Sequence, residues 1–195
     1  MERASWEIMN EAIDNRRSTY TKQFEPDEKI DDEIVWQIMR NANRAPTHKL
    51  TQPWRFTVFT GEGLKKLAQL QVKLVTKIKP DLPEGKLRKL SEKPLKASHI
   101  IAITLKRHPG LVPEIEEILA VGCAIENMYL TANAYGVGCY FSTGGITYLE
   151  EAKEFFGLSA NDKLIGFFYI GKKKEMPDIK TTRGNVEEKV TWIRE

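Results

Sequence analysis

Apolar residues recur along the 195-residue chain with two different spacings, which distinguish helices from strands. Helical spacing predicts a first helix over residues 5–15, with Ser5 as its N-cap, and a second helix capped by Asp31 or Asp32. Alternating or continuous runs of β-branched and aromatic residues predict strands over 54–60, 98–106, 137–142 and 163–170.

Three more helices are predicted between these strands. They cover residues 64–79, residues 113–135 and a shorter stretch near 148–156. The long one begins with a proline in its first turn and stops at Gly136. Residues 80–94 are polar, with three prolines and several lysines, so we expect a mobile excursion there and not a domain linker.

Two segments suggest contacts beyond a simple core. Residues 119–125, in the middle of the long helix, are apolar on every face, which places them centrally or at a subunit interface. Residues 171–195 are charged, and their few apolar side chains have little of their own to pack against. Such a tail lies on the body or reaches across to a second subunit.

The order of these elements predicts a single domain. Long helices separate strands along the chain, which is typical of an α+β or α/β domain with three layers. We expect residues 1–195 to form this one domain, with residues 172–195 as an extended C-terminal arm.

Charge and apolar content limit the partners to expect. The 30 basic and 27 acidic residues give a net charge of +3, which argues against nucleic acid as the main partner but allows a local phosphate site. No apolar run approaches the roughly 20 residues that span a bilayer, and the first residues lack a signal-peptide core. Without such a run, we expect no membrane partner. Because the chain has two cysteines and no metal-type spacing, we expect a reduced, cytoplasmic protein.

Side chains for acid–base or nucleophilic catalysis are few. The three histidines are His48, His99 and His108, and the last two are expected to be structural. No Gly-x-Ser-x-Gly motif occurs, so a hydrolase is disfavoured. Cys123 and Cys139 are expected in the core, and no metal site is predicted.

Two polar segments suggest an anionic, planar ligand. Arg16, Arg17 and Ser18 follow the first helix and suit a phosphate monoester, although arginines there also complement a helix dipole. Residues 44–56 place arginine, histidine, lysine and glutamine around two prolines that stiffen the backbone. Neither a Walker motif nor a Gly-x-Gly-x-x-Gly motif occurs, so a P-loop and a Rossmann site are both unsupported.

The ordered set of motifs resembles the FMN-dependent nitroreductase family, and most of all its short, minimal members. The matching motifs are Arg16-Arg17-Ser18, Ala45-Pro46, Gln52-Pro53-Trp54-Arg55-Phe56, Gly136-Val137-Gly138 and a strand that ends in Gly171. They cover nearly the full length of the chain. The resemblance implies an α+β fold of the three-layer α/β/α type, with FMN bound at a homodimer interface.

The resemblance also implies which residues would hold the FMN phosphate and ribityl chain. Arg16 and Ser18 match phosphate ligands of the family, with Arg17 adjacent. A basic pair in the family's tail holds the same phosphate, and its equivalents here are Lys180 and Arg183.

Further residues are implied as walls of the flavin site. Arg44 and His48 match positions that touch FMN, often from the partner subunit, and Gln52 lies near the same wall. The segment that would line the isoalloxazine ring consists of Phe141, Ser142 and Thr143.

The chemistry implied by the resemblance is hydride transfer from NAD(P)H to FMN, then to a nitroaromatic, a quinone or a similar small electron-poor acceptor. The flavin carries the reaction, so no catalytic side chain is expected. Leu50 and Ser142 depart from the family pattern and motivate an alternative, an FMN sensor or storage protein with little turnover. A second alternative is a flavin-free scaffold or interaction domain.

Overall fold

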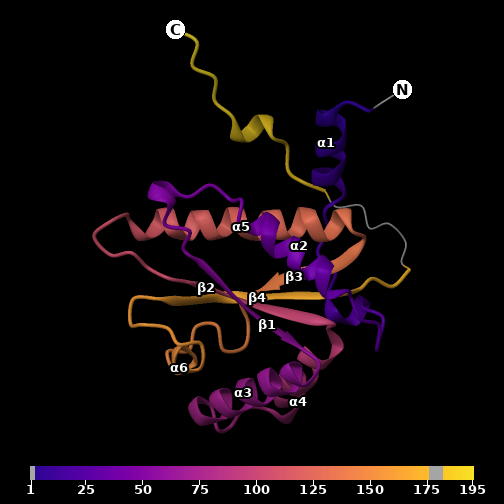
Figure 1. Cartoon of the computed structure of the whole chain (residues 1–195), viewed down its shortest axis with the longest axis vertical. Coiled ribbons are helices and arrows are strands. Elements are labelled where there is room, and N and C mark those ends of the chain that lie inside the picture. Colours follow the sequence, from indigo (N-terminus) through magenta and orange to yellow (C-terminus); the bar gives the residue numbers. More distant parts are fainter. Residues whose placement is uncertain (1–2, 176–181) are drawn as a thin grey trace.

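The computed structural model of the chain describes residues 3–175 and 182–195 and is built on one antiparallel sheet (Figure 1). Its strand order is β1-β2-β4-β3, so β1 and β3 lie at the two edges. The strands are β1 (Trp54–Thr60), β2 (His99–Leu105), β3 (Val137–Ser142) and β4 (Lys163–Lys172). All four lie where the spacing of apolar residues predicts them.

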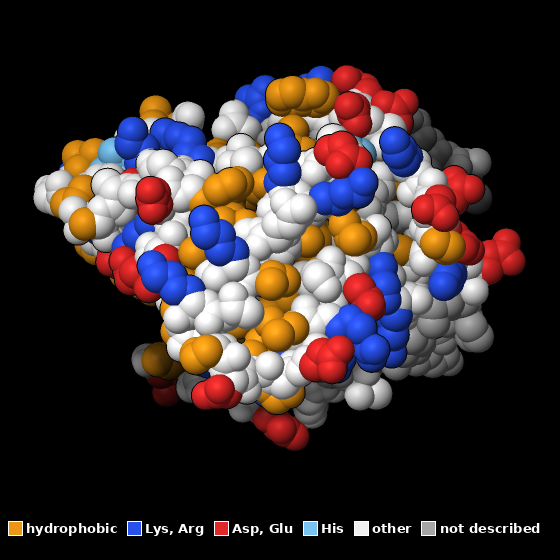
Figure 2. All heavy atoms as spheres, turned by 90° about the horizontal axis from the view of Figure 1, so that it is seen from below, with side chains coloured by type: hydrophobic (Ala, Val, Ile, Leu, Met, Phe, Trp, Pro, Cys, Tyr) orange, Lys and Arg blue, Asp and Glu red, His pale blue; other side chains and the backbone are white. Residues whose placement is uncertain are grey.

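Helices cover both faces of the sheet and make three layers, which confirms the α+β prediction (Figure 1). One layer contains α2 (Asp32–Ala42) and α5 (Glu114–Ala134), and α1 (Ser5–Asn15) contacts α5. The opposite layer contains α3 (Glu62–Ile78), α4 (Glu84–Glu92) and α6 (Ala152–Phe155). Figure 2 shows the outer surface of this second layer, where Lys and Arg side chains lie among apolar patches.

The core consists of two apolar clusters, one on each side of the sheet. Every residue of β2 is buried, and alternate residues enter opposite clusters. Ile101 and Ile103 face α5, whereas Ile100 and Ala102 face α3. A strand covered on both faces gains apolar burial from every position, which explains its continuous apolar sequence.

Residues 80–94 do not form the predicted excursion. They contain α4, which packs against α3. Leu87 and Leu90 of α4 are half-buried. Pro83 is the N-cap of this helix, and Pro94 follows its C-cap residue, Lys93. The prolines therefore bound a helix, which their position permits, and do not interrupt one.

Two other helix boundaries differ from the predicted ones. The N-cap of α1 is Ala4 and not Ser5, and the Glu7 carboxylate accepts a hydrogen bond from the Ala4 N–H at 3.1 Å. The predicted helix over 148–156 shortens to the four residues of α6. The N-cap of α2 is Asp31, whose side chain accepts from the Glu33 N–H at 2.9 Å, as predicted.

The buried His99 and the half-buried His108 have structural partners, as expected. His99 lies between Ser98 and Asp32, with each ring nitrogen 2.9 Å from an oxygen. His108 Nδ1 lies 2.6 Å from the carboxylate of the buried Glu117. Among the described residues, no group of histidine, cysteine and acidic side chains has the arrangement of a metal site. Likewise, no helix within residues 3–175 and 182–195 is long and apolar enough to cross a bilayer.

Cys139 is buried as predicted, but Cys123 is exposed. It lies on the same side of α5 as Ile115 and Leu119, which are 59% and 61% exposed. The prediction for Cys123 was wrong for a single chain because only part of this apolar helix packs on the sheet. The outer side of α5 is therefore an exposed apolar stripe on an otherwise packed helix.

Candidate functional site

A first group of predicted residues meets where α1 ends on α5. The Arg16 guanidinium lies over the ring of Tyr129, 5.2 Å from its centroid, and its Nε is 3.7 Å from the Glu126 carboxylate. The Arg16 side chain is 20% exposed, and that of Glu126 is 53% exposed. Arg16 is thus held against α5 with its charged end near the surface.

The hydroxyl of Tyr129 joins two other segments at this point. It lies 3.3 Å from the Ser18 hydroxyl and accepts a 2.6 Å hydrogen bond from the main-chain N–H of Phe141. The Thr19 N–H donates to the Cys139 carbonyl at 2.8 Å, so the loop after α1 runs beside β3. The predicted phosphate segment and the predicted flavin wall are therefore brought together in one chain.

Arg17 is turned differently from Arg16. Its guanidinium donates to the main-chain carbonyls of Asp14 and Arg16, the latter at 2.9 Å. These contacts satisfy carbonyls at the end of α1, the role that arginine commonly has at a helix C-terminus.

The exit from β3 forms the other wall of this corner. Ser142 Oγ accepts a hydrogen bond from the Gly144 N–H at 3.3 Å, and Thr147 Oγ1 donates to the Gly144 carbonyl at 3.0 Å. A Cβ added to Gly166 would lie 2.5 Å from the Phe141 ring, so this glycine provides the space in which the ring lies. Ser142 and Thr143 follow the ring where β3 ends, at the open edge of the sheet.

A second group of predicted residues lies in the loop between α2 and β1. His48 Nδ1 is 2.5 Å from the Glu116 carboxylate, and Lys49 Nζ donates to the Leu111 carbonyl at 3.0 Å. The side chains of Arg44 and His48 are exposed. These contacts attach the loop to the beginning of α5.

The backbone of this loop is strained. Lys49, Leu50 and Gln52 have φ angles of 49°, 53° and 42°, a left-handed conformation that side chains with a Cβ rarely adopt. The Gln52 N–H donates to Thr47 Oγ1 at 3.2 Å and helps to hold the turn. Such strain persists only where surrounding contacts enforce it, and it concentrates at ligand-binding segments.

The two groups do not form one site within a single chain. The first group contacts α5 at Glu126 and the second group at Glu116. These two residues are ten positions apart, which corresponds to about 15 Å along a helix. Arg183 lies in the exposed segment 182–195, where its guanidinium donates to the Thr182 carbonyl at 3.2 Å. Lys180 lies outside the described residues.

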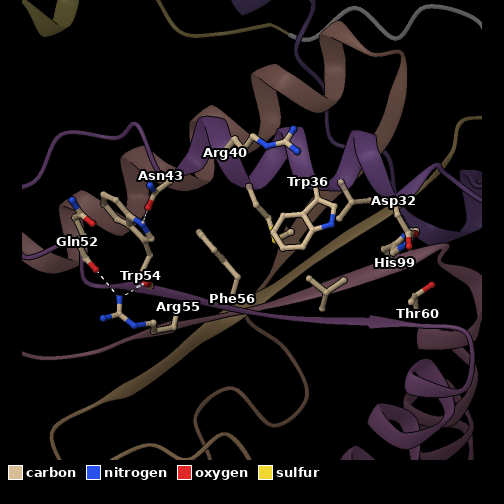
Figure 3. A pocket seen from close by; sticks show the side chains of 13 residues that line it. Asp32, Trp36, Arg40, Asn43, Gln52, Trp54, Arg55, Phe56, Thr60 and His99 are labelled. Atoms are coloured by element: carbon tan, nitrogen blue, oxygen red, sulfur yellow. Dashed lines mark hydrogen bonds and ion pairs between the residues drawn. The ribbon is translucent and has the colours of Figure 1, made fainter.

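A separate groove of about 660 Å³ runs between α2 and β1 (Figure 3). Trp36 from α2 and Phe56 from β1 point into it, with Gln52 near one end and His99 near the other. Trp36 is 56% exposed. Because β1 is an edge strand, the groove lies beside a strand that has a neighbour on one side only.

Sequence reasoning missed Glu126, Tyr129 and this groove. The only local signal for Glu126 and Tyr129 was their spacing of three positions after the apolar stretch 119–125, which places both on one face of the helix. Of the residues that line the groove, Gln52 was named from the sequence, but as part of the flavin wall and not of a groove.

Comparison with known proteins gives a consistent result. The model of the "Nitroreductase family" matches residues 13–172. The protein named "Putative NAD(P)H nitroreductase YdjA" of Escherichia coli strain K12 is 34% identical over 163 residues, which cover 83% of this chain and 86% of that protein.

Solved structures share the fold. The nitroreductase-like family protein of Bacillus cereus has a TM-score of 0.84 and 25% identity, with 99% of this chain and 98% of that chain covered. The FMN-dependent nitroreductase NfnB of Mycobacterium smegmatis, solved in complex with NADPH, has a TM-score of 0.74 at 16% identity and covers 98% of this chain and 100% of its own.

Proposed function

Because this chain belongs to the nitroreductase family, we propose that it is an FMN-dependent oxidoreductase that takes hydride from NAD(P)H and reduces nitroaromatics, quinones or similar electron-poor acceptors. The E. coli relative is named for NAD(P)H, and the M. smegmatis enzyme for FMN, with NADPH bound. The observation that carries the proposal is the meeting of Arg16, Ser18 and the end of β3 around Tyr129.

The donor set at this corner fits a phosphate monoester. Among the described residues, the Arg16 guanidinium has one carboxylate neighbour, Glu126, at 3.7 Å, which is long for a hydrogen-bonded pair. A phosphate dianion would compete well for it, because guanidinium–phosphate contacts are short and charge-assisted. Ser18 would add a hydroxyl donor beside it.

The end of β3 would hold the flavin ring. Ser142 Oγ accepts from a main-chain N–H, which leaves its own proton for an acceptor atom of a ligand. Phe141 and Thr143, the residues before and after Ser142, would also border the flavin ring. FMN supplies the hydride chemistry when it is bound, and the protein positions the ring and shields it from water.

We propose that two copies of the chain complete the site. The exposed side of α5 carries Ile115, Leu119 and Cys123, and a second copy would remove these side chains from water. An antiparallel crossing of the two α5 helices around a twofold axis near residue 121 would set Glu116 of one copy opposite Glu126 of the other. That pairing would bring His48 and Arg44 of one copy to the Arg16 corner of the other.

The C-terminal arm could contact the other copy in such a dimer. Val190, Trp192 and Ile193 are 47%, 76% and 86% exposed, and the arm runs away from the sheet (Figure 1). We propose that the arm of one copy enters the groove beside β1 of the other. Its apolar side chains would meet Trp36 and Phe56, and its backbone would pair with the free edge of β1.

Turnover with a soluble acceptor tests the proposal. The purified chain is supplied with FMN, then with NADH or NADPH, and finally with a quinone or a nitroaromatic. Oxidation of the nicotinamide that depends on both FMN and acceptor supports an oxidoreductase. Tight FMN binding without oxidation would favour the sensor or storage alternative, and absence of FMN binding would favour a flavin-free scaffold.

A further inference from the structure

Within the second layer, the part formed by α3, α4 and the 3₁₀ turn Pro94–Lys96, here called the α3–α4 layer, carries an uneven share of the positive charge. Residues 62–96 contain ten Lys and Arg residues and four Asp and Glu residues, a balance of +6, whereas the whole chain has +3. The small net charge of the whole chain argues against nucleic acid as the main partner, but it averages over this asymmetry. A local excess of one sign determines which surfaces a protein approaches.

Most of these cations have no acidic partner. Among the residues that the structure describes, only Lys65 and Arg88 lie within 4.0 Å of a carboxylate, at 2.7 Å from Glu62 and 3.9 Å from Glu92. All ten side chains are exposed except that of Lys93, which is half-buried over the rings of Tyr140 and Tyr169. The exposed lysines other than Lys65 therefore have no described carboxylate within ion-pair distance, and they give this surface an excess of positive charge.

Apolar side chains lie within the same surface. Ile78 at the end of α3 is 39% exposed, and Leu95 after α4 is 50% exposed. Figure 2 shows apolar patches between the Lys and Arg side chains of this face. A basic surface with isolated apolar side chains has the composition of a protein that lies on the headgroups of an anionic bilayer.

We propose that the α3–α4 layer docks on anionic lipid bilayers. Nine of its ten basic residues are lysines, and residues 62–96 contain no aromatic side chain. Nucleic-acid surfaces typically add arginine forks for bases and phosphates, or aromatic rings for stacking, and this layer has one arginine. Lysines with exposed Ile78 and Leu95 instead suit lipid phosphates and the outer acyl region.

The position of the layer leaves it free for this role. It covers the face of the sheet opposite to α5, whereas the Arg16 corner and the exposed stripe of α5 lie on the other side (Figure 1). Docking would bring the oxidoreductase close to lipid-soluble acceptors such as quinones, a consequence that rests on the proposed function. The docking itself is measured without turnover, so it can fail or succeed independently of the enzyme activity.

Vesicle sedimentation of the full chain tests the proposal. We expect the protein to sediment with phosphatidylcholine vesicles that contain roughly 30% phosphatidylglycerol, and to bind pure phosphatidylcholine at least tenfold more weakly. Binding to the anionic vesicles should fall when salt is raised to about 1 M, because the screening length shrinks to roughly 3 Å. Failure to bind anionic vesicles at low salt would overturn the proposal.

Two charge-matched triple variants locate the surface. Lys73→Glu, Lys77→Glu and Lys89→Glu together should weaken binding to anionic vesicles at least tenfold, because about three favourable surface charges are reversed. The control reverses Lys22, Lys29 and Lys106, which lie outside residues 62–96, and should stay within about threefold of the unmodified chain. Equal losses in the two variants, both with unchanged melting temperature, would contradict a dedicated surface.

A third variant separates a bilayer from other polyanions. Replacing Ile78 and Leu95 with serine keeps every charge and should weaken vesicle binding a few-fold by removing apolar insertion. If a short DNA duplex instead binds the protein tightly enough to displace it from the vesicles, and the serine variant binds vesicles as before, the layer is a nucleic-acid surface and the proposal is wrong.

Discussion

The hydroxyl of Tyr129, in the C-terminal half of α5, lies 3.3 Å from the hydroxyl of Ser18, which is 111 residues earlier in the chain. The same oxygen accepts a hydrogen bond from the Phe141 N–H. One side chain of the central helix therefore connects the proposed phosphate segment to the strand proposed to hold the flavin ring. Binding of FMN across these two segments would depend on this connection.

Removing the Tyr129 hydroxyl tests the connection. Tyr129→Phe leaves the Phe141 N–H without its acceptor, which should cost about 1–3 kcal/mol of stability and weaken FMN binding several-fold. Urea denaturation and quenching of flavin fluorescence measure the two effects. Tyr135→Phe, at a 52% exposed position after α5, is the control and should change neither quantity. FMN affinity unchanged in Tyr129→Phe would show that the hydroxyl does not position the site.

The two adjacent arginines should differ in their effect on FMN. Arg16→Ala should weaken FMN binding by more than tenfold, because a charge-assisted contact to the phosphate is lost. Arg17→Ala should cause a loss below about threefold, because its guanidinium is occupied by the carbonyls that end α1. Titration of the flavin-free protein with FMN measures both. Equal losses in the two variants would contradict the assignment of the phosphate to Arg16.

The exposed stripe of α5 should be covered in solution. Leu119→Asp would place an unpaired carboxylate in the proposed interface and should shift the protein from dimer to monomer. Sedimentation velocity across a range of concentrations measures this shift. Leu95→Asp, at a position exposed to a similar extent on the opposite layer, is the control and should leave the dimer intact. A monomeric unmodified protein would refute the dimer proposal outright.

The C-terminal arm should contribute to stability through Trp192. Trp192→Ala should lower the melting temperature by about 5 °C or more, because a large aromatic side chain would lose its place in the groove. Val186→Ala, earlier in the arm and 61% exposed, is the control and should shift the melting temperature by less than about 1 °C. An unchanged melting temperature in Trp192→Ala would mean that the arm stays in solvent.

The close approach of Gly166 to Phe141 should not tolerate a side chain. A Cβ there would lie 2.5 Å from the Phe141 ring and 2.7 Å from the Ser142 carbonyl oxygen. Gly166→Ala should therefore cost about 1–3 kcal/mol of stability and weaken FMN binding by moving the end of β3. Gly85→Ala, in α4 with no atom near its added Cβ, is the control and should be neutral or stabilising.

Strands were predictable from the sequence because burial on both faces leaves a direct signal. The run Ile100-Ile101-Ala102-Ile103 has apolar residues at every position because alternate residues enter opposite clusters. The helix α4 was missed because its lysines and the prolines that flank it suggest a loop, whereas the helix depends on packing against α3. Tertiary contacts outweighed composition there.

The candidate site was predictable only where one segment carries its own signal. Arg16 and Ser18 are two positions apart in the sequence, so the sequence alone was enough to propose them as ligands. Tyr129 could not, because its hydroxyl gains its role from residues 12 and 111 positions away. The groove beside β1 is likewise a property of how α2 lies against the sheet.

The most direct test of the account is an anaerobic absorbance titration of the FMN-loaded protein with NADH and, separately, with NADPH. The account predicts that the flavin bands bleach with about one equivalent of at least one nicotinamide per FMN and return when air is admitted. Flavin that stays oxidised with both donors, or protein that retains no flavin, would contradict it.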